Sequence, residues 1–134
     1  MKKQPVVLID DDIDDFLVIR AMATAIYFPN PVVAFTDPVA ALDFLAKSSE
    51  PPLLVLSDLN MPKLNGFQLR MKMLELHRPA YDTIPFIILS TSKTDDEVLH
   101  AKKLDITAFY KKEDTFEGLR RTLQKIKTLL ISPV

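Results

Sequence analysis

Short apolar runs alternate along this chain with longer segments whose apolar residues have helical spacing. The five runs predicted as strands are Val6–Asp10, Val32–Phe35, Leu53–Asp58, Phe86–Ser90 and Ala108–Lys111. Five helices are expected at Asp14–Ala25, Pro38–Ala46, Gly66–Leu76, Asp95–Leu104 and Phe116–Leu130. Repeated strand–helix units are typical of an α/β protein with a parallel sheet. Uninterrupted apolar strands further indicate that helices cover both faces of that sheet.

The last predicted helix has the clearest pattern. Its apolar residues repeat at steps of three and four, at Phe116, Leu119, Leu123, Ile126 and Leu130. This spacing places them on one side of a helix, so a single apolar stripe is predicted to face the core.

Length and composition favour one domain. The 134 residues, 48% of them hydrophobic, suffice to bury about two-thirds of the surface that the unfolded chain exposes, and we expect a single domain over residues 1–134. The apolar run after the basic N-terminus ends at Ile9, too early for a signal peptide, so a cytoplasmic location is expected. The absence of cysteine excludes disulfides, zinc–thiolate sites and thiol nucleophiles. A net charge of −1 argues against nucleic acid as a direct partner.

Acidic residues follow the ends of two predicted strands. A strand order of 2-1-3-4-5 would place the carboxyl ends of the first and third strands side by side, where ligands bind in such sheets. Asp10, Asp11 and Asp12 end the first strand, and Asp58 ends the third. The loop after Asp58 leads to Gly66, one of only two glycines, which indicates a backbone position that does not tolerate a side chain.

The aspartates have a structural and a chemical interpretation. Any one of them alone fits a helix N-cap or a solvated loop, and we interpret Asp14 and Asp15 in this way. Asp10, Asp11 and Asp58 together would repel one another unless a cation neutralised them. Mg²⁺ is usually held by carboxylates, a backbone carbonyl and waters, and it also neutralises a phosphoryl group during transfer. The cluster therefore predicts a Mg²⁺ site with Asp58 as a candidate nucleophile.

The fourth and fifth strands bring a hydroxyl group and an ammonium group to the same edge. The fourth ends at Ser90, Thr91 and Ser92, and the fifth ends at Lys111 and Lys112. Each residue taken singly is equally well explained as a solvated strand end. Beside the carboxylates, however, a hydroxyl donor and a cation supply what a phosphoryl group needs on its other oxygens.

These motifs resemble those of the receiver domains of two-component response regulators, the CheY-like superfamily. Residues 7–12 resemble the acidic-pair strand of that family, residues 57–66 its phosphoacceptor loop, and residues 88–92 its hydroxyl-bearing strand. The resemblance covers nearly the whole chain. Within the family, the chain is most similar to small stand-alone regulators related to those of phytochrome kinases. It implies a flavodoxin-like (βα)5 three-layer sandwich, with sheet order 2-1-3-4-5 and no output domain.

The resemblance also implies roles for the acidic residues. Asp58 is the expected phosphoacceptor, forming 4-aspartylphosphate. Asp11 and Asp58 are expected to bind Mg²⁺ through their carboxylates, Asn60 through its backbone carbonyl, and Asp10 through water or by orienting the site. A phosphoryl group on Asp58 would then lie beside the metal ion.

Three further residues complete the expected site. Ser90 would donate to the phosphoryl group and act as a switch together with the aromatic Phe109, while Lys112 would pair with the phosphate. Lys112 lies 22 residues after Ser90 and three after Phe109, which fits the family's spacing better than the adjacent Lys111 does. Glu113 follows where the family usually has proline, so the usual marker of this lysine is missing.

The function implied by the resemblance is phosphorelay signalling. A sensor histidine kinase or phosphotransfer protein would transfer a phosphoryl group from phosphohistidine to Asp58, and a face built from the fourth helix, fifth strand and fifth helix would then bind a downstream protein. The chain would not be an enzyme in the ordinary sense, although it would catalyse its own dephosphorylation. No membrane partner is expected, and a homodimer is compatible with this function.

Two alternatives use parts of the same pattern. A haloacid-dehalogenase-type phosphatase would use Asp10 as nucleophile with Asp12 after it, but it calls for Thr or Val where Asp14 stands, and it leaves the loop after Asp58 unexplained. A phosphorylation-independent receiver-like binding module would keep the fold but lose acidic residues or the lysine, and all of these are present.

Overall fold

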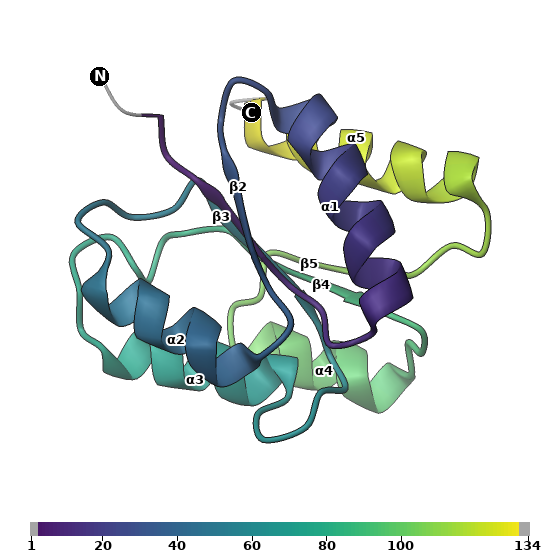
Figure 1. Cartoon of the computed structure of the whole chain (residues 1–134). Coiled ribbons are helices and arrows are strands. Elements are labelled where there is room, and N and C mark those ends of the chain that lie inside the picture. The colour runs from purple at the N-terminus through teal and green to yellow at the C-terminus, as the bar shows by residue number, and fades with distance from the viewer. Residues whose placement is uncertain (1–2, 132–134) are drawn as a thin grey trace.

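The computed structural model describes residues 3–131 and contains one parallel sheet of five strands with five helices (Figure 1). Strands and helices alternate along the whole described chain, as the sequence predicts. In chain order the elements are β1 (Val6–Ile9), α1 (Ile13–Tyr27), β2 (Val32–Phe35), α2 (Pro38–Lys47), β3 (Leu54–Asp58), α3 (Gly66–Glu75), β4 (Phe86–Ser90), α4 (Asp95–Lys103), β5 (Ala108–Lys111) and α5 (Phe116–Ile131). The strand order is β2-β1-β3-β4-β5, which confirms the expected topology.

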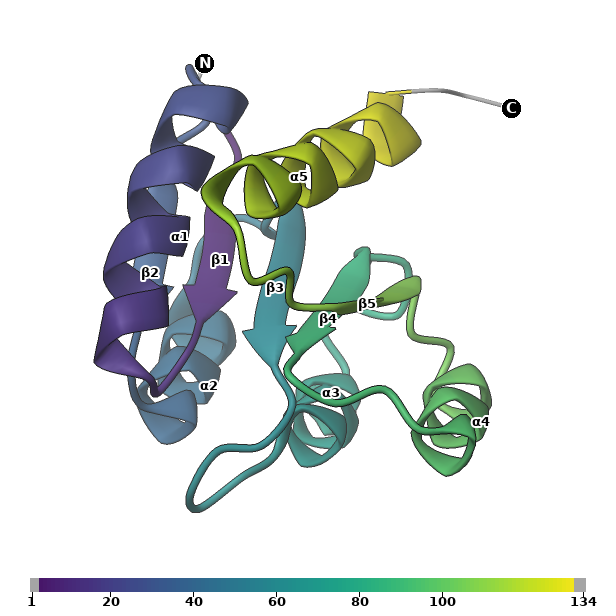
Figure 2. The ribbon, with the colours of Figure 1, turned by 90° about the vertical axis from the view of Figure 1, so that its right-hand side faces the viewer.

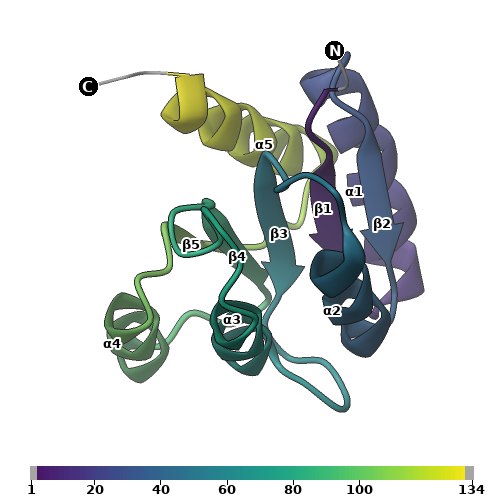
Figure 3. The same ribbon diagram turned by 90° about the vertical axis from the view of Figure 1, so that its left-hand side faces the viewer.

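The helices form two layers around the sheet. Helices α1 and α5 cover one face, and α2, α3 and α4 cover the other (Figure 2). Figure 3 shows these last three helices in a row beneath the sheet. Side chains of a strand alternate between the two layers: Val6 and Leu8 of β1 pack with α1 and α5, whereas Val7 and Ile9 pack with α2 and α3. The core therefore consists of two hydrophobic layers, one on each face.

The predicted elements agree with the observed ones within two residues at each end. The main difference in packing is in α5. Leu119, Leu123 and Ile126 are buried as expected, but Phe116 is 70% exposed. Phe116 is the first residue of α5, and the buried stripe of the helix begins at Leu119. The prediction that the apolar stripe begins at Phe116 was wrong.

The strand register places the predicted site residues at the carboxyl edge of the sheet. Ile9 of β1 lies opposite Ser57 of β3, so Asp10 follows β1 beside Asp58, the last residue of β3. Asp58 in turn lies opposite Leu89 of β4. Figure 2 shows the arrowheads of β1 and β3 pointing to this same edge. In the described chain, no helix combines the length and apolar character needed to cross a membrane.

Candidate functional site

Three carboxylates converge at the carboxyl edge of the sheet. One carboxylate oxygen from each of Asp10, Asp11 and Asp58 lies within 4.8 Å of the others. Asp10 and Asp58 are only 1% and 9% exposed, and Asp11 is the most exposed of the three. The structure therefore brings together the three aspartates that the sequence predicted as neighbours.

Asp10 is held at both carboxylate oxygens. Its Oδ1 accepts a hydrogen bond from the Asp12 backbone N–H at 3.0 Å, and its Oδ2 accepts one from Lys112 Nζ at 2.8 Å. Burial raises the pKa of the Asp10 carboxyl, and the bonds from Lys112 and Asp12 oppose that rise. Asp12 itself is the N-cap of α1, accepting from the backbone N–H groups of Asp14 and Asp15. Asp10 is thus a fixed part of the site.

Asp58 has fewer hydrogen-bond partners. Its Oδ1 accepts a hydrogen bond from the backbone N–H of Leu59 at 2.8 Å, and Lys112 Nζ lies 3.7 Å from the same oxygen, beyond hydrogen-bonding distance. Burial raises the pKa of Asp58 from 3.8 to about 6, with Lys112 opposing the rise and Asp10 adding to it. Asp58 is therefore a carboxylate that is oriented by the backbone and receives no hydrogen bond from Lys112.

The loop after β3 approaches the strand end closely. A side-chain carbon at Gly66 would lie 2.7 Å from the backbone oxygen of Asp58, closer than atoms can pack, and the Gly66 N–H donates to the Leu59 carbonyl at 2.8 Å. The prediction that this position excludes a side chain is confirmed. Asn65 then caps α3 with a reciprocal bond to Gln68, which fixes the exit of the loop.

Lys112 reaches the carboxylates, and its neighbour Lys111 does not. The Lys112 side chain is 8% exposed, with Nζ 2.8 Å from Asp10 Oδ2 and 2.9 Å from Asp15 Oδ2. Burial alone would lower the pKa of Lys112, but the hydrogen bonds to the two carboxylates outweigh it and raise that pKa. Lys111 is exposed. The backbone N–H of Lys112 also donates to the Ser90 carbonyl at 2.6 Å, which positions the lysine beside β4.

The remaining predicted residues surround this cluster. Ser90 is fully buried at the end of β4, and its Oγ accepts from the Ser92 backbone N–H at 3.3 Å. Asn60 lies on the rim of the cavity above Asp58. Phe109 is 9% exposed and packs into the layer formed by α2, α3 and α4, away from the cavity.

Three residues that line the cavity were not assigned to the site from the sequence, and one of them, Asp12, is the N-cap of α1. Asp15, interpreted as structural, contacts Lys112, and Thr91 rather than Ser90 lines the cavity. The sequence carried no separate signal for Asp15, because an acidic residue in the first turn of a helix is already explained by the helix dipole. Thr91 carried no signal either, because adjacent hydroxyl residues at a strand end cannot be ranked by spacing.

The donor set fits a hard divalent cation. The cavity above Asp58, about 420 Å³, is lined by Asp11, Asp12, Asp15, Asp58, Asn60, Thr91 and Lys112. Its walls offer carboxylate and carbonyl oxygens but neither cysteine nor histidine, which suits Mg²⁺ or Mn²⁺ better than zinc. Three clustered carboxylates face a single ammonium, so a bound cation would relieve their repulsion.

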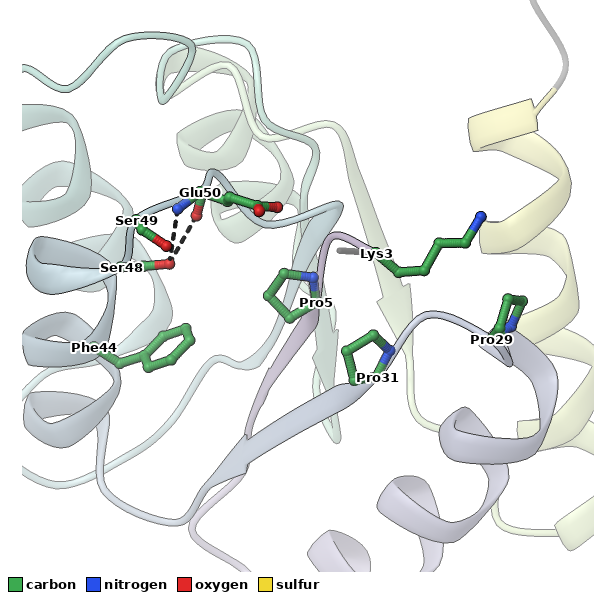
Figure 4. A pocket seen from close by; sticks show the side chains of 8 residues that line it. All are labelled: Lys3, Pro5, Pro29, Pro31, Phe44, Ser48, Ser49 and Glu50. Carbon is green, nitrogen blue, oxygen red and sulfur yellow. Dashed lines mark hydrogen bonds between the residues drawn. The ribbon is translucent and has the colours of Figure 1, made fainter. Parts of the chain in front are cut away.

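A larger cavity of about 500 Å³ lies at the opposite edge of the sheet (Figure 4). Its walls are mainly Pro5, Pro29, Pro31 and Phe44, with Lys3 and the segment 48–50 at the margin. The polar contacts drawn there are local, between the Ser48 hydroxyl and the backbone of Glu50. This cavity is the larger of the two, but charged groups do not converge in it. The clustered carboxylates and Lys112 line the smaller cavity above Asp58, which is therefore the candidate site.

Known proteins resemble this chain over most of its length. The probable methanogenesis regulatory protein FilR2 of Methanothrix harundinacea is 28% identical over 126 residues, which cover 91% of this chain and 80% of that protein. The response regulator Rcp1 of Synechocystis is 24% identical over 134 residues, covering 96% of this chain and 90% of Rcp1.

Solved structures share the fold. The phosphorylated cyanobacterial phytochrome response regulator RcpA superposes with a TM-score of 0.84 at 24% identity, covering 98% of this chain and 96% of RcpA. The Mn²⁺-bound form of Rcp1 superposes with a TM-score of 0.81 at 24% identity and the same coverage. These likenesses confirm the flavodoxin-like, CheY-like architecture.

The family itself is established by sequence. The model of the response regulator receiver domain matches residues 6–124, which includes every strand and all of the carboxylate cluster. This chain therefore belongs to the response regulator receiver domain family, whose members are signalling modules of two-component phosphorelays.

Proposed function

We propose that this chain accepts a phosphoryl group on Asp58 from the phosphohistidine of a sensor histidine kinase or phosphotransfer protein. The observation that carries the proposal is the environment of Asp58: a buried carboxylate, oriented by the Leu59 N–H, between an acidic cluster and Lys112. A structural aspartate at a strand end needs neither the two further carboxylates nor the buried ammonium.

Transfer of the phosphoryl group from phosphohistidine to Asp58 needs no further reactant. A carboxylate oxygen of Asp58 attacks phosphorus, the phosphorus–nitrogen bond breaks, and its electron pair stays on the donor imidazole. Mg²⁺, held by Asp11, Asp58 and the Asn60 carbonyl, would neutralise charge on the phosphoryl oxygens. Rcp1 has been solved with Mn²⁺, which supports a divalent cation in this family of sites. Asp10 keeps the lysine and the α1 loop in place through both of its oxygens.

Signalling follows from a shift between two conformations. The phosphoryl group would attract Lys112 and the Ser90 hydroxyl, and Phe109 would adjust to the movement of Ser90. Two arrangements of this kind exchange as a population shift, and about 5 kcal/mol of differential binding moves such an equilibrium from about 1% to about 99%. A few charge-assisted hydrogen bonds at the phosphoryl group supply that amount. The output face would be α4, β5 and α5, where a downstream protein would bind.

Dephosphorylation of Asp58 would complete the signalling cycle. Water attacking phosphorus in the same site would break its bond to the Asp58 oxygen, release inorganic phosphate and restore the free Asp58 carboxylate. A single receiver domain over residues 1–134, acting in the cytoplasm, is the setting in which we propose this function.

The test is the intact mass after incubation with acetyl phosphate and Mg²⁺. We expect a gain of one phosphoryl group, lost when EDTA is added first, and absent from Asp58→Ala. Asp10→Ala is the control for the phosphatase alternative, in which Asp10 rather than Asp58 would be the nucleophile. A phosphoryl adduct that persists in Asp58→Ala and disappears in Asp10→Ala would overturn the proposal.

A further inference from the structure

Asp15 connects the first turn of α1 to the lysine of β5. Its backbone N–H donates to the Asp12 carboxylate at 3.1 Å, so the helix start is fixed. Its own carboxylate extends across the site to Lys112 Nζ at 2.9 Å. This contact joins residues 97 positions apart and does not belong to the local capping of α1.

The two carboxylates that hold Lys112 determine how close the ammonium comes to Asp58. Nζ lies 2.8 Å from Asp10 and 2.9 Å from Asp15, whereas its distance to Asp58 Oδ1 is 3.7 Å. A lysine ammonium has three donors, and two of them are used in these bonds. The resting position of Lys112 is therefore set by Asp10 and Asp15 together, to one side of the proposed phosphoacceptor.

The two partners differ in how easily they can release the lysine. Asp10 is 1% exposed, so removing its cation would leave a buried charge unpaired, which is costly. The Asp15 side chain is 41% exposed, so water can solvate its carboxylate once the lysine leaves. If Lys112 turns toward a phosphoryl group on Asp58, the bond that breaks at least cost is the one to Asp15.

We infer that Asp15 is a positioning residue that holds Lys112 in the resting state and competes with the phosphoryl group for its ammonium. This inference rests on the proposed function of Asp58 and adds a regulatory contact to the same site. Asp15 does not touch the reacting atoms. It biases the equilibrium between resting and phosphorylated arrangements toward rest, because its bond to Lys112 exists only in the resting arrangement.

The test compares Asp15→Asn with Asp14→Asn. Both variants remove one negative charge from the first turn of α1, but Asp14 is exposed and forms no ion pair with any residue between 3 and 131. Asp14→Asn therefore controls for the change in charge and in the helix dipole. Asp15→Glu, which keeps a carboxylate, is the conservative variant.

The first readout is the ¹⁵N-ammonium NMR signal of Lys112 without metal or phosphoryl donor. It should change in Asp15→Asn and remain in place in Asp14→Asn. The second is binding of beryllofluoride with Mg²⁺, a mimic of the phosphoryl group on a carboxylate. Loss of one charge-assisted bond in the resting state should tighten that binding about tenfold in Asp15→Asn relative to Asp14→Asn. Asp15→Glu should return both readouts toward the wild type.

The outcomes separate the inference from the proposed function. Equal ammonium signals and equal beryllofluoride affinities in the two Asn variants would overturn the role of Asp15 while leaving Asp58 as the acceptor. A wild-type protein that binds no beryllofluoride would overturn the proposed function and, with it, the competition for Lys112. A changed ammonium signal without tighter beryllofluoride binding would show that the contact exists but does not bias the equilibrium, which also overturns the inference.

Discussion

Two buried cations stabilise different parts of this molecule in different ways. Lys112 is surrounded by carboxylates, with Asp10, Asp15 and Asp58 all within 4 Å of its ammonium. Arg70 of α3, 2% exposed, forms no ion pair with any described residue and donates only to backbone carbonyls. Side-chain carboxylates can exchange one partner for another, whereas backbone carbonyls are fixed in the fold. The comparison assigns Arg70 to the scaffold and supports the proposal that Lys112 moves during signalling.

The partners of Arg70 show what it holds together. It donates to the carbonyls of Leu104 and Asp105, just after α4, and to those of Tyr81 and Asp82, in the segment before β4. Burial lowers the pKa of the Arg70 guanidinium, and Asp105 and Asp82 oppose that effect. A cation at the carboxyl end of α4 also complements the helix dipole. Arg70 thus connects α3 to the end of α4 and to the segment before β4.

The largest expected effect is on stability at Arg70. Arg70→Ala removes a fully buried side chain and leaves buried carbonyls with lost partners, so the free energy of unfolding should fall by about 3–5 kcal/mol. Urea unfolding followed by circular dichroism measures it. Arg70→Met retains most of the volume and should recover part of the loss. A decrease of less than about 1 kcal/mol in Arg70→Ala would mean that the bonds from Arg70 to the backbone carbonyls contribute little to stability. The contrast with Lys112 would then be wrong.

The next effect concerns Asp58 and depends on pH. Burial raises the folded-state pKa of Asp58 to about 6, so the folded protein favours the protonated, neutral carboxyl. The stability that this protonated group contributes is fully present below pH 3.8, the unfolded pKa, and is lost as pH rises through about 6. Asp58→Asn, neutral at every pH, should therefore be more stable than the wild type at pH 7 by about 2–3 kcal/mol. The difference should shrink toward zero near pH 4. Urea unfolding in EDTA at both pH values measures it, and a gain that does not change with pH would contradict this explanation.

Replacing the lysine tests the mobile cation directly. Lys112→Ala removes a charge-assisted contact to the phosphoryl group of about 1.5–3 kcal/mol. It should still accept some phosphoryl at Asp58 but should fail to show beryllofluoride-induced amide shifts around Phe109. Lys111→Ala, one residue earlier and exposed, should behave like the wild type in both assays. The reverse pattern would move the functional lysine by one residue.

The smallest effect tests whether charge matters when the acceptor is a backbone carbonyl. Tyr27, 2% exposed, donates its hydroxyl to the Leu123 carbonyl at 3.1 Å and links α1 to α5. Tyr27→Phe removes this neutral bond and should lower the free energy of unfolding by only about 1 kcal/mol. A loss as large as that of Arg70→Ala would show that the carbonyl contact, rather than the buried charge, sets the cost.

Periodicity predicted the strands and helices, and the resemblance to receiver domains implied the strand order that the structure confirms. The convergence of Asp10, Asp11 and Asp58 follows from that order, because it places the ends of the first and third strands side by side. The sequence also favoured Lys112 over Lys111, and the structure brings Lys112 to the carboxylates. Arg70 was not foreseen, since a charged residue within a helix is normally exposed, and only tertiary packing reveals its burial. The contact of Asp15 with Lys112 was not foreseen for a related reason: an acidic residue in the first turn of a helix is already explained by capping and the dipole.

The most direct test is a single NMR comparison of the two cations. The ¹⁵N-ammonium signal of Lys112 and the Nε–H signal of Arg70 are recorded before and after Mg²⁺ and beryllofluoride are added, with Asp58→Asn as the control. We predict that the Lys112 signal moves to a new position, that the Arg70 signal stays where it was, and that neither changes in the control. A Lys112 signal that does not move while beryllofluoride is bound, or one that moves no more than that of Arg70, would contradict the account.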